Sequence, residues 1–368
     1  MNRRNPPKVY VAVLVLLLFV SSFQTDVRAQ SPLDPVVILY DASHGPQFEP
    51  GDAANGLKLM LDMVNASTRY IVKVHRDTPI NETVLRDVDI LIVASPDRTY
   101  EYTKNESIAI TKMLANGSSL FVLGDPMINQ TSRYWSEAPF QDLGDNVAVN
   151  RFLDQLNMTG VRFSTNQTGP DSIWSDTMFD YDHALNKSVP YVIRLDSTSW
   201  DSTHPIFRDI NELLVMTATL RPIDTASAVA NGYKSSFAQF KVSPFSYGNT
   251  SFPNMSLADL AQHPLKYSAI NGTRPPWLAA FEYDSSRVVV CGSTIMFSGR
   301  PLDLPTSDSR RETQWFYSAD NSRLFMNILG WLSQEFVEAP GAIPPMLAIS
   351  SVLLFVGLAY YIVKKMKP

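Results

Sequence analysis

Polar side chains gather directly after the first apolar run of the mature chain, "VVILYDASHGP" (residues 36–46). A continuous apolar run predicts a strand buried on both faces, and open α/β sheets bind ligands beyond the carboxyl ends of such strands. Our candidates for a ligand-binding edge are therefore Asp41, Ser43, His44 and Gly45. The alternative is a loop in which the carboxylate and the hydroxyl bond to backbone groups before the next helix.

A second polar group lies in "FDYDHALN" (residues 179–186). Asp180, Asp182 and His183 offer carboxylate oxygens and an imidazole nitrogen, which are common cation ligands. Because Asp and His in a polar loop are more often solvated, these three are weak candidates, and we expect neither a metal site nor a cofactor. The sequence also contains no Gly-x-Ser-x-Gly elbow and no Gly-x-x-x-x-Gly-Lys phosphate loop.

The first 29 residues have the layout of a secretory signal peptide. Three basic residues precede an apolar run from Val9 to Val20, and small residues stand before Gln30. A helix of that run would be about 18 Å long, too short for a hydrocarbon core of about 30 Å. An uncleaved signal anchor extended to Phe23 is the alternative.

Residues 343–363 carry no charge and would span about 31 Å as a helix, enough for one membrane crossing. Tyr360 and Tyr361 suit the interfacial aromatic belt, and the lysines of residues 364–368 mark the cytoplasmic side. We therefore expect a single-pass protein anchored in the lipid bilayer. Its N-terminal ectodomain would be extracellular or lumenal, with residues 364–368 as a cytoplasmic tail.

The composition indicates a folded ectodomain without nucleic-acid chemistry. Hydrophobic residues make up 45% of the chain and charged residues 18%, which leaves ample material for a core. The net charge is −5 and no long basic run lies outside the termini, so we expect no nucleic-acid partner. The single cysteine, Cys291, rules out an internal disulfide.

Asn-x-Ser/Thr sequons are far more frequent than the composition predicts by chance. The eleven sequon asparagines are Asn65, Asn81, Asn105, Asn116, Asn129, Asn157, Asn166, Asn186, Asn249, Asn254 and Asn271. Asn, Ser and Thr share a preference for loops, which would cluster them without any modification. That preference does not reach eleven, so we expect heavy N-glycosylation. Together with the low cysteine content, this is typical of an archaeal-type surface glycoprotein.

Strand and helix patterns alternate in the first half of the chain, which predicts an α/β core over residues 35–158. We expect strands at residues 36–41, 69–76, 87–96 and 120–123, and helices at residues 53–65, 103–117 and 146–157. Thr103 and Glu106 form a capping box at the start of the second helix. The predicted fold is an open, mostly parallel sheet with helices on both faces.

We assign the second half of the chain to the same ectodomain, residues 33–336, as additions to the α/β core. Residues 159–210 are rich in Ser, Thr, Asn and Asp and predict an irregular insertion with one strand at residues 191–195. Residues 211–335 supply the closing strands and helix. Residues 278–283 and 287–292 predict an antiparallel hairpin, and residues 318–336 predict the last helix.

Three segments in this order resemble the class I glutamine amidotransferase-like fold, which belongs to the flavodoxin-like folds: residues 87–126, "THPIFRDI" (203–210) and "RVVVCGSTIMFSG" (287–299). The resemblance covers roughly residues 35–335. It is stronger to the non-catalytic, membrane-anchored branches of the superfamily. These include the 48 kDa subunit of oligosaccharyltransferase, auxiliary domains of ABC transporters and gliding machinery, and a related domain of a ciliary transport protein.

The resemblance also implies where a nucleophile would stand. Catalytic members carry a cysteine just after the strand equivalent to residues 120–123, and a His-Pro-Glu motif. Here Gly124-Asp125-Pro126 follows that strand, and His204-Pro205-Ile206 lacks the carboxylate. Cys291 lies inside the apolar run "VVVCG" and reads as a buried structural thiol. We therefore expect no catalytic residues and no enzymatic activity.

The resemblance implies a non-enzymatic accessory subunit that docks on an integral membrane protein complex, most specifically of the oligosaccharyltransferase type. One departure counts against that specific match: no additional β-rich domain fits between residue 335 and the predicted membrane helix. An auxiliary extracytoplasmic component of an ABC-type transporter is the alternative within this class. A surface ligand-binding protein or hydrolase that uses the Asp41–His44 edge is the alternative of another class.

Overall fold

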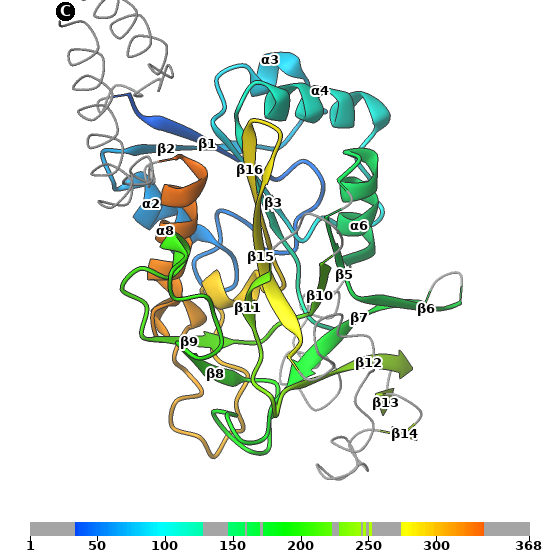
Figure 1. The fold of residues 1–368 in the computed structure, drawn as a ribbon, viewed down its shortest axis with the longest axis vertical. Helices are drawn as coiled ribbons and strands as arrows, with labels where there is room; N and C mark the ends of the chain where they lie inside the picture. Colours follow the sequence, from blue (N-terminus) through cyan, green and yellow to red (C-terminus); the bar gives the residue numbers. More distant parts are fainter. Residues whose placement is uncertain are drawn as a thin grey trace, which may run out of the picture. The chain divides into compact units, whose positions relative to one another are not determined.

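A seven-stranded sheet forms the centre of the computed structural model, which describes residues 34–127, 146–158, 160–169, 172–222, 228–243, 246–247, 250–251 and 274–334 (Figure 1). In spatial order its strands are β11 (Ala228–Asn231), β15 (Pro276–Tyr283), β16 (Ser286–Cys291), β4 (Ser119–Leu123), β3 (Ile90–Ala94), β1 (Val36–Asp41) and β2 (Tyr70–His75). The strands from β16 to β2 are mutually parallel, and β15 pairs antiparallel with both of its neighbours. The mostly parallel sheet and the hairpin were both predicted.

Alternating side chains of the central strands divide the core between the two faces of the sheet. Every residue of β3 and β4 is buried, as expected for strands covered on both sides. Leu91 and Leu120 pack into the cluster beneath one set of helices, whereas Ile92 and Phe121 pack into the other. The period of two along each strand thus assigns neighbouring residues to opposite layers.

Helices cover both faces, as predicted (Figure 1). On one side are α2 (Lys58–Asn65) and α8 (Asn321–Leu332), whose apolar residues join the same cluster. On the other side are α3 (Glu82–Leu85), α4 (Lys104–Ala115) and α6 (Asn146–Gln155). The expected capping box is present at the start of α4, where Glu106 returns a side-chain hydrogen bond to the backbone of Thr103.

Residues 159–210 were predicted as an irregular insertion with one strand at residues 191–195, but the structure has four strands there, one of which overlaps the predicted one. That region contains β5 (Val161–Phe163), β6 (Thr165–Gly169), β7 (Ser172–Phe179) and β8 (Ile193–Asp196). Its partners come from later in the chain: β9 (Glu212–Val215), β10 (Leu220–Pro222), β12 (Phe237–Ser243), β13 (Ser246–Tyr247) and β14 (Thr250–Ser251). They form one five-stranded and two two-stranded sheets. The sequence did not reveal β5 and β7 because their partners β10 and β12 are distant along the chain.

Short 3-10 helices follow several strands: η2 (Pro205–Phe207), η3 (Ile295–Phe297) and η4 (Trp315–Tyr317). Within the part of the chain that the structure describes, no helix is long and apolar enough to cross a membrane. The predicted signal peptide (1–29), membrane helix (343–363) and tail (364–368) lie outside the described residues.

Candidate functional site

The predicted ligand edge is built around the last residue of β1. Asp41 Oδ1 accepts hydrogen bonds from the Ser43 backbone N–H at 2.9 Å and from Ser43 Oγ at 2.6 Å. This turn brings the ring of His44 back over the strand end, where Nδ1 lies 2.7 Å from Asp41 Oδ2. The structure therefore brings three of the predicted residues together through contacts with one another.

Tyr102, just before α4, and Glu106, in its first turn, complete this cluster, and sequence reasoning missed their part in it. Glu106 Oε1 lies 3.3 Å from His44 Nε2, and it also accepts a hydrogen bond from the Ile80 N–H at 2.9 Å. Tyr102 stacks on the imidazole with ring centroids 3.7 Å apart, and its hydroxyl donates to Asp41 Oδ2. The capping-box pattern identified Glu106 only as a helix cap, because nothing in the sequence links it to a loop sixty residues earlier.

The cluster is almost completely buried: Asp41, His44, Glu106 and Tyr102 are 3%, 6%, 3% and 4% exposed. Burial alone would lower the pKa of His44, but the hydrogen bond to Asp41 and the charges of Asp41 and Glu106 outweigh it, so the pKa is raised. Burial alone would raise the pKa of Asp41, yet its hydrogen bonds and the charge of His44 lower it. Both shifts favour an imidazolium held between two carboxylates.

The adjacent loops are joined by backbone hydrogen bonds at the switch point between β1 and β3, where open sheets of this order bind ligands. The Asp97 N–H donates to the His44 carbonyl at 2.9 Å, and the Gln47 N–H donates to the Ser95 carbonyl at 3.2 Å. Gly45 has φ +57°, and a Cβ atom there would lie 2.9 Å from the Tyr100 ring. The crevice is therefore filled by the protein itself.

Asp125 occupies the turn after β4, where the resemblance would place a nucleophile. Its Oδ2 accepts a hydrogen bond from Ser95 Oγ at 2.6 Å. Its Oδ1 accepts from the backbone N–H groups of Thr294 and Ile295 at 3.1 and 3.0 Å. Burial raises the pKa of Asp125 to about 6, although these bonds and the charge of Arg300 oppose the shift. The carboxylate thus ties together the ends of β3, β4 and β16.

Ser95 stands out because it is a non-glycine residue with φ +43°, immediately after the last residue of β3. Such a conformation costs about 1–2 kcal/mol unless the surroundings enforce it. Here the Ser95 N–H donates to the Leu123 carbonyl at 2.9 Å, and its hydroxyl lies 2.9 Å from Thr294 Oγ1. The strained turn is therefore fixed by bonds to the end of β4 and to the segment that follows β16.

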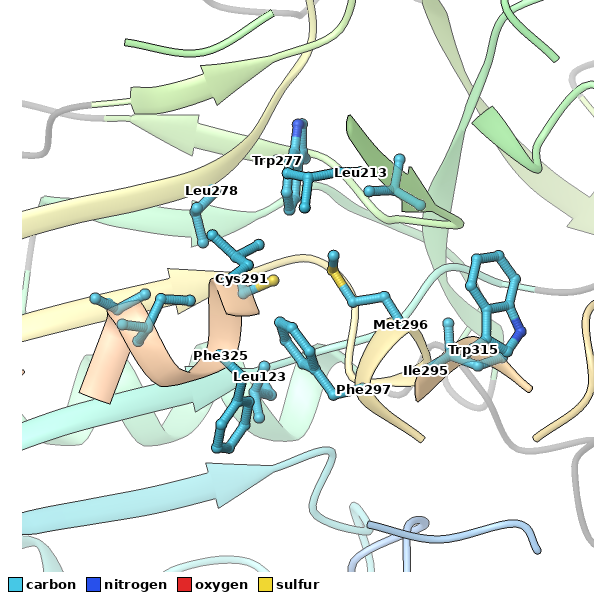
Figure 2. Packing of buried hydrophobic residues seen from close by; sticks show 14 of the residues in the cluster. Leu123, Leu213, Trp277, Leu278, Cys291, Ile295, Met296, Phe297, Trp315 and Phe325 are labelled. Carbon is cyan, nitrogen blue, oxygen red and sulfur yellow. The ribbon is translucent and has the colours of Figure 1, made fainter. Parts of the chain in front are cut away.

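Cys291 is surrounded by apolar side chains from several elements, among them Leu123, Trp277 and Phe325 (Figure 2). The thiol is completely buried, and burial raises its pKa far above the ordinary value. His204 begins η2, where Nδ1 accepts a hydrogen bond from the Ile206 N–H at 3.3 Å. Both residues therefore act in packing and capping in this structure.

The weak cation candidates form a hydrogen-bonded cluster around Asp180. Its Oδ1 accepts from the Asp182 and His183 N–H groups, both at 2.9 Å, and its Oδ2 accepts from Ser236 Oγ at 2.7 Å. His183 Nδ1 lies 3.0 Å from Oδ1, and its ring stacks on Tyr233 with centroids 3.6 Å apart. Among the described residues, no group of three or more His, Cys, Asp or Glu could hold a metal ion.

Most of the sequon asparagines that the structure describes are exposed. The exposed ones are Asn65, Asn81, Asn105, Asn116 and Asn157. Asn186 is partly buried, and its Nδ2 donates to Asp308 Oδ2 at 3.0 Å. Asn129, Asn249, Asn254 and Asn271 lie outside the described residues, as does the side chain of Asn166. The exposed side chains leave room for the predicted modification.

Comparisons with known proteins place the fold and nothing finer. No family model and no curated protein matches the chain. The N-terminal domain of mmIFT52 matches 81% of this chain and 97% of its own length, with a TM-score of 0.50 and 17% sequence identity. A ThuA-like protein from Parabacteroides merdae matches 82% of this chain and 91% of its own length, with a TM-score of 0.42 and 6% identity.

At such identities the similarity shows the fold alone. The match to the mmIFT52 domain supports the predicted fold in its general form, a mostly parallel α/β sheet. The closer resemblance to the oligosaccharyltransferase subunit stays a prediction.

Proposed function

We propose that this chain is a non-enzymatic accessory subunit of a membrane protein complex, with its α/β domain as a docking module outside the cytoplasm. The observation that carries the proposal is the filled edge of the sheet. At the strand ends where this architecture would hold a ligand or a nucleophile, the polar groups of His44, Asp41 and Asp125 are bonded to other protein groups.

A domain whose ligand edge has become part of its own core is left with its outer surface for interactions. The predicted anchor would keep that surface close to the bilayer, where an integral membrane partner is within reach. Within this class we favour an oligosaccharyltransferase-type complex, because the resemblance includes the predicted signal peptide, domain order and C-terminal anchor. The same anchored docking domain would also serve an ABC-type transporter, and the proteins captured with the chain distinguish the two complexes.

The test is extraction of native membranes in mild detergent, capture of the full chain, and mass spectrometry of the proteins retained with it. Recovery of an oligosaccharyltransferase catalytic subunit at a fixed ratio is the expected result. Recovery of a transporter permease would keep the accessory role and replace the specific complex. Recovery of the chain alone, as a discrete species at full yield, would overturn the proposal.

A second measurement addresses the competing class, a receptor or hydrolase at the Asp41–His44 edge. A folded His44→Gln variant that still captures the same partners as the natural chain would fit the accessory role. Loss of a surface binding or hydrolytic activity in that variant, with the partners unchanged, would favour the competing class.

A further inference from the structure

A groove of about 390 Å³ is lined by the connections that follow the carboxyl ends of β1 and β16. The loop after β1 contributes Asn55, and the long connection after β16 contributes Gly299, Glu312, Thr313, Gln314 and Tyr317. Its volume lies within the range of about 300–1,000 Å³ that is typical of small-molecule sites. The groove is therefore large enough for a ligand, and none of its lining residues belongs to the His44 cluster.

The two walls of the groove are fixed to each other. The Gly299 N–H donates to the Gly56 carbonyl at 2.9 Å, and a Cβ atom on Gly299 would lie 2.0 Å from the Ala53 carbonyl oxygen. Arg300 is fully buried, its Nε donates to the Asn55 carbonyl at 3.1 Å, and its guanidinium lies 4.2 Å from the centre of the Phe48 ring. A preformed groove loses little conformational freedom when a ligand binds.

Tyr317 gives the groove an aromatic surface. This side chain is 64% exposed, which is the largest exposure among the large hydrophobic residues that the structure describes. It belongs to η4, which is anchored by the fully buried Trp315, and Phe316 packs edge-on against its ring at 4.7 Å. A rigid, exposed tyrosine offers an apolar face and a hydroxyl at low entropic cost.

The polar groups that line the groove are uncharged apart from one carboxylate. Asn55 and Gln314 present amides, Thr313 a hydroxyl and Glu312 a carboxylate. No Lys, Arg or His is among the described residues that line it, and Glu312 is paired with Arg311, whose Nε lies 3.8 Å from its Oε1. Amides and carboxylates pair with hydroxyl groups, and an aromatic ring covers an apolar C–H face. A pyranose ring carries both kinds of surface.

From these features we infer that the groove is a binding site for a neutral saccharide, with Tyr317 as the stacking platform and Asn55, Gln314 and Glu312 as partners of its hydroxyls. The inference rests on the geometry of the groove and does not depend on the accessory-subunit proposal. Failure of the partner capture would therefore leave the saccharide inference standing. Failure of saccharide binding would leave the accessory-subunit proposal standing.

The test uses the full chain produced in a host without N-glycosylation and purified in a detergent without a sugar headgroup. This keeps foreign and attached sugars out of the groove. The probe is an array of neutral oligosaccharides of glucose, mannose, galactose and N-acetylglucosamine, followed by calorimetric titration of those retained. We expect binding that weakens about tenfold in Tyr317→Ala, the size of one lost aromatic contact.

Tyr100→Ala is the matched control, because Tyr100 is 58% exposed on the loop after β3 and does not line the groove. Gln314→Ala gives a second, smaller perturbation should Tyr317→Ala unfold. Absence of binding across the array would overturn the inference. So would equal affinity in Tyr317→Ala, Gln314→Ala and Tyr100→Ala, or retention of peptides in place of sugars at the same groove.

Discussion

Replacement of His44 by alanine tests whether this histidine is a structural clamp. The variant leaves the carboxylates of Asp41 and Glu106 buried without the cation that lies between them, at 2.7 and 3.3 Å. Removal of one partner from a buried ion pair costs about 3–5 kcal/mol, because the remaining charge stays desolvated. We therefore expect the free energy of unfolding to fall by about that amount, a large share of a typical domain's 5–15 kcal/mol.

The pH dependence gives the same prediction a second readout. Because the pKa of His44 is raised in the folded state, its stabilisation is complete below the unfolded value of about 6.5. That stabilisation is lost as the pH rises through the folded value. Because the pKa of Asp41 is lowered, its stabilisation is present above the unfolded value of about 3.9 and is lost as the pH falls through the folded value.

Urea unfolding followed by tryptophan fluorescence between pH 5 and 9 measures the His44 effect, and the same measurement below about pH 4 follows the Asp41 effect. The alkaline loss of stability should be present in the natural chain and absent in His44→Ala. His75→Ala is the control, since the ring of His75 makes an exposed hydrogen bond to the Thr78 carbonyl. A His44→Ala variant that loses less than about 1 kcal/mol, or keeps the alkaline slope, would refute the clamp.

Three further predictions concern the strand ends and the groove. Asp125→Asn should abolish a loss of about 3 kcal/mol of stability that occurs as the pH rises from 4 to 6, because the pKa of Asp125 is raised from 3.8 to about 6 in the folded state. Measurement of unfolding as a function of pH tests this. Asp125→Ala should be less stable than Asp125→Asn. Cys291 should react with iodoacetamide only after unfolding, as mass spectrometry can follow, since the thiol is completely buried. Gly299→Ala should lower the free energy of unfolding by about 1–3 kcal/mol through its clash with Ala53, whereas Gly51→Ala, with its nearest contact at 3.9 Å, should leave it unchanged in denaturation curves.

The central sheet could be predicted because its strands carry their own signals. The apolar runs that became β1, β3 and β4 are long enough to be buried on both faces, and helical spacing identified α4 and α8 between and after them. The strands β5 to β7 could not be found in this way, whereas β8 overlaps the strand predicted at residues 191–195. The pairing of β5 with β10 and of β7 with β12 depends on contacts that sequence spacing does not reveal.

In the candidate site, too, the sequence predicted only the contacts made within one segment of the chain. Asp41, Ser43 and His44 were grouped correctly because they follow one strand, but their partners Tyr102 and Glu106 arrive from another connection. Without those partners, a buried clamp and an open ligand edge have the same sequence pattern.

The contacts of Ser95, Asp125 and Thr294 explain how the α/β sheet can keep a strained residue at the end of β3. A serine at φ +43° beside a buried carboxylate would suit an activated nucleophile if the hydroxyl faced a cavity. Here the hydroxyl is bonded to Asp125 on one side and to Thr294 on the other, so the turn is stabilised by three strand ends at once. Strain at this position therefore follows from the way the strands meet, and the exposed groove beside Tyr317 is the better place to look for a ligand.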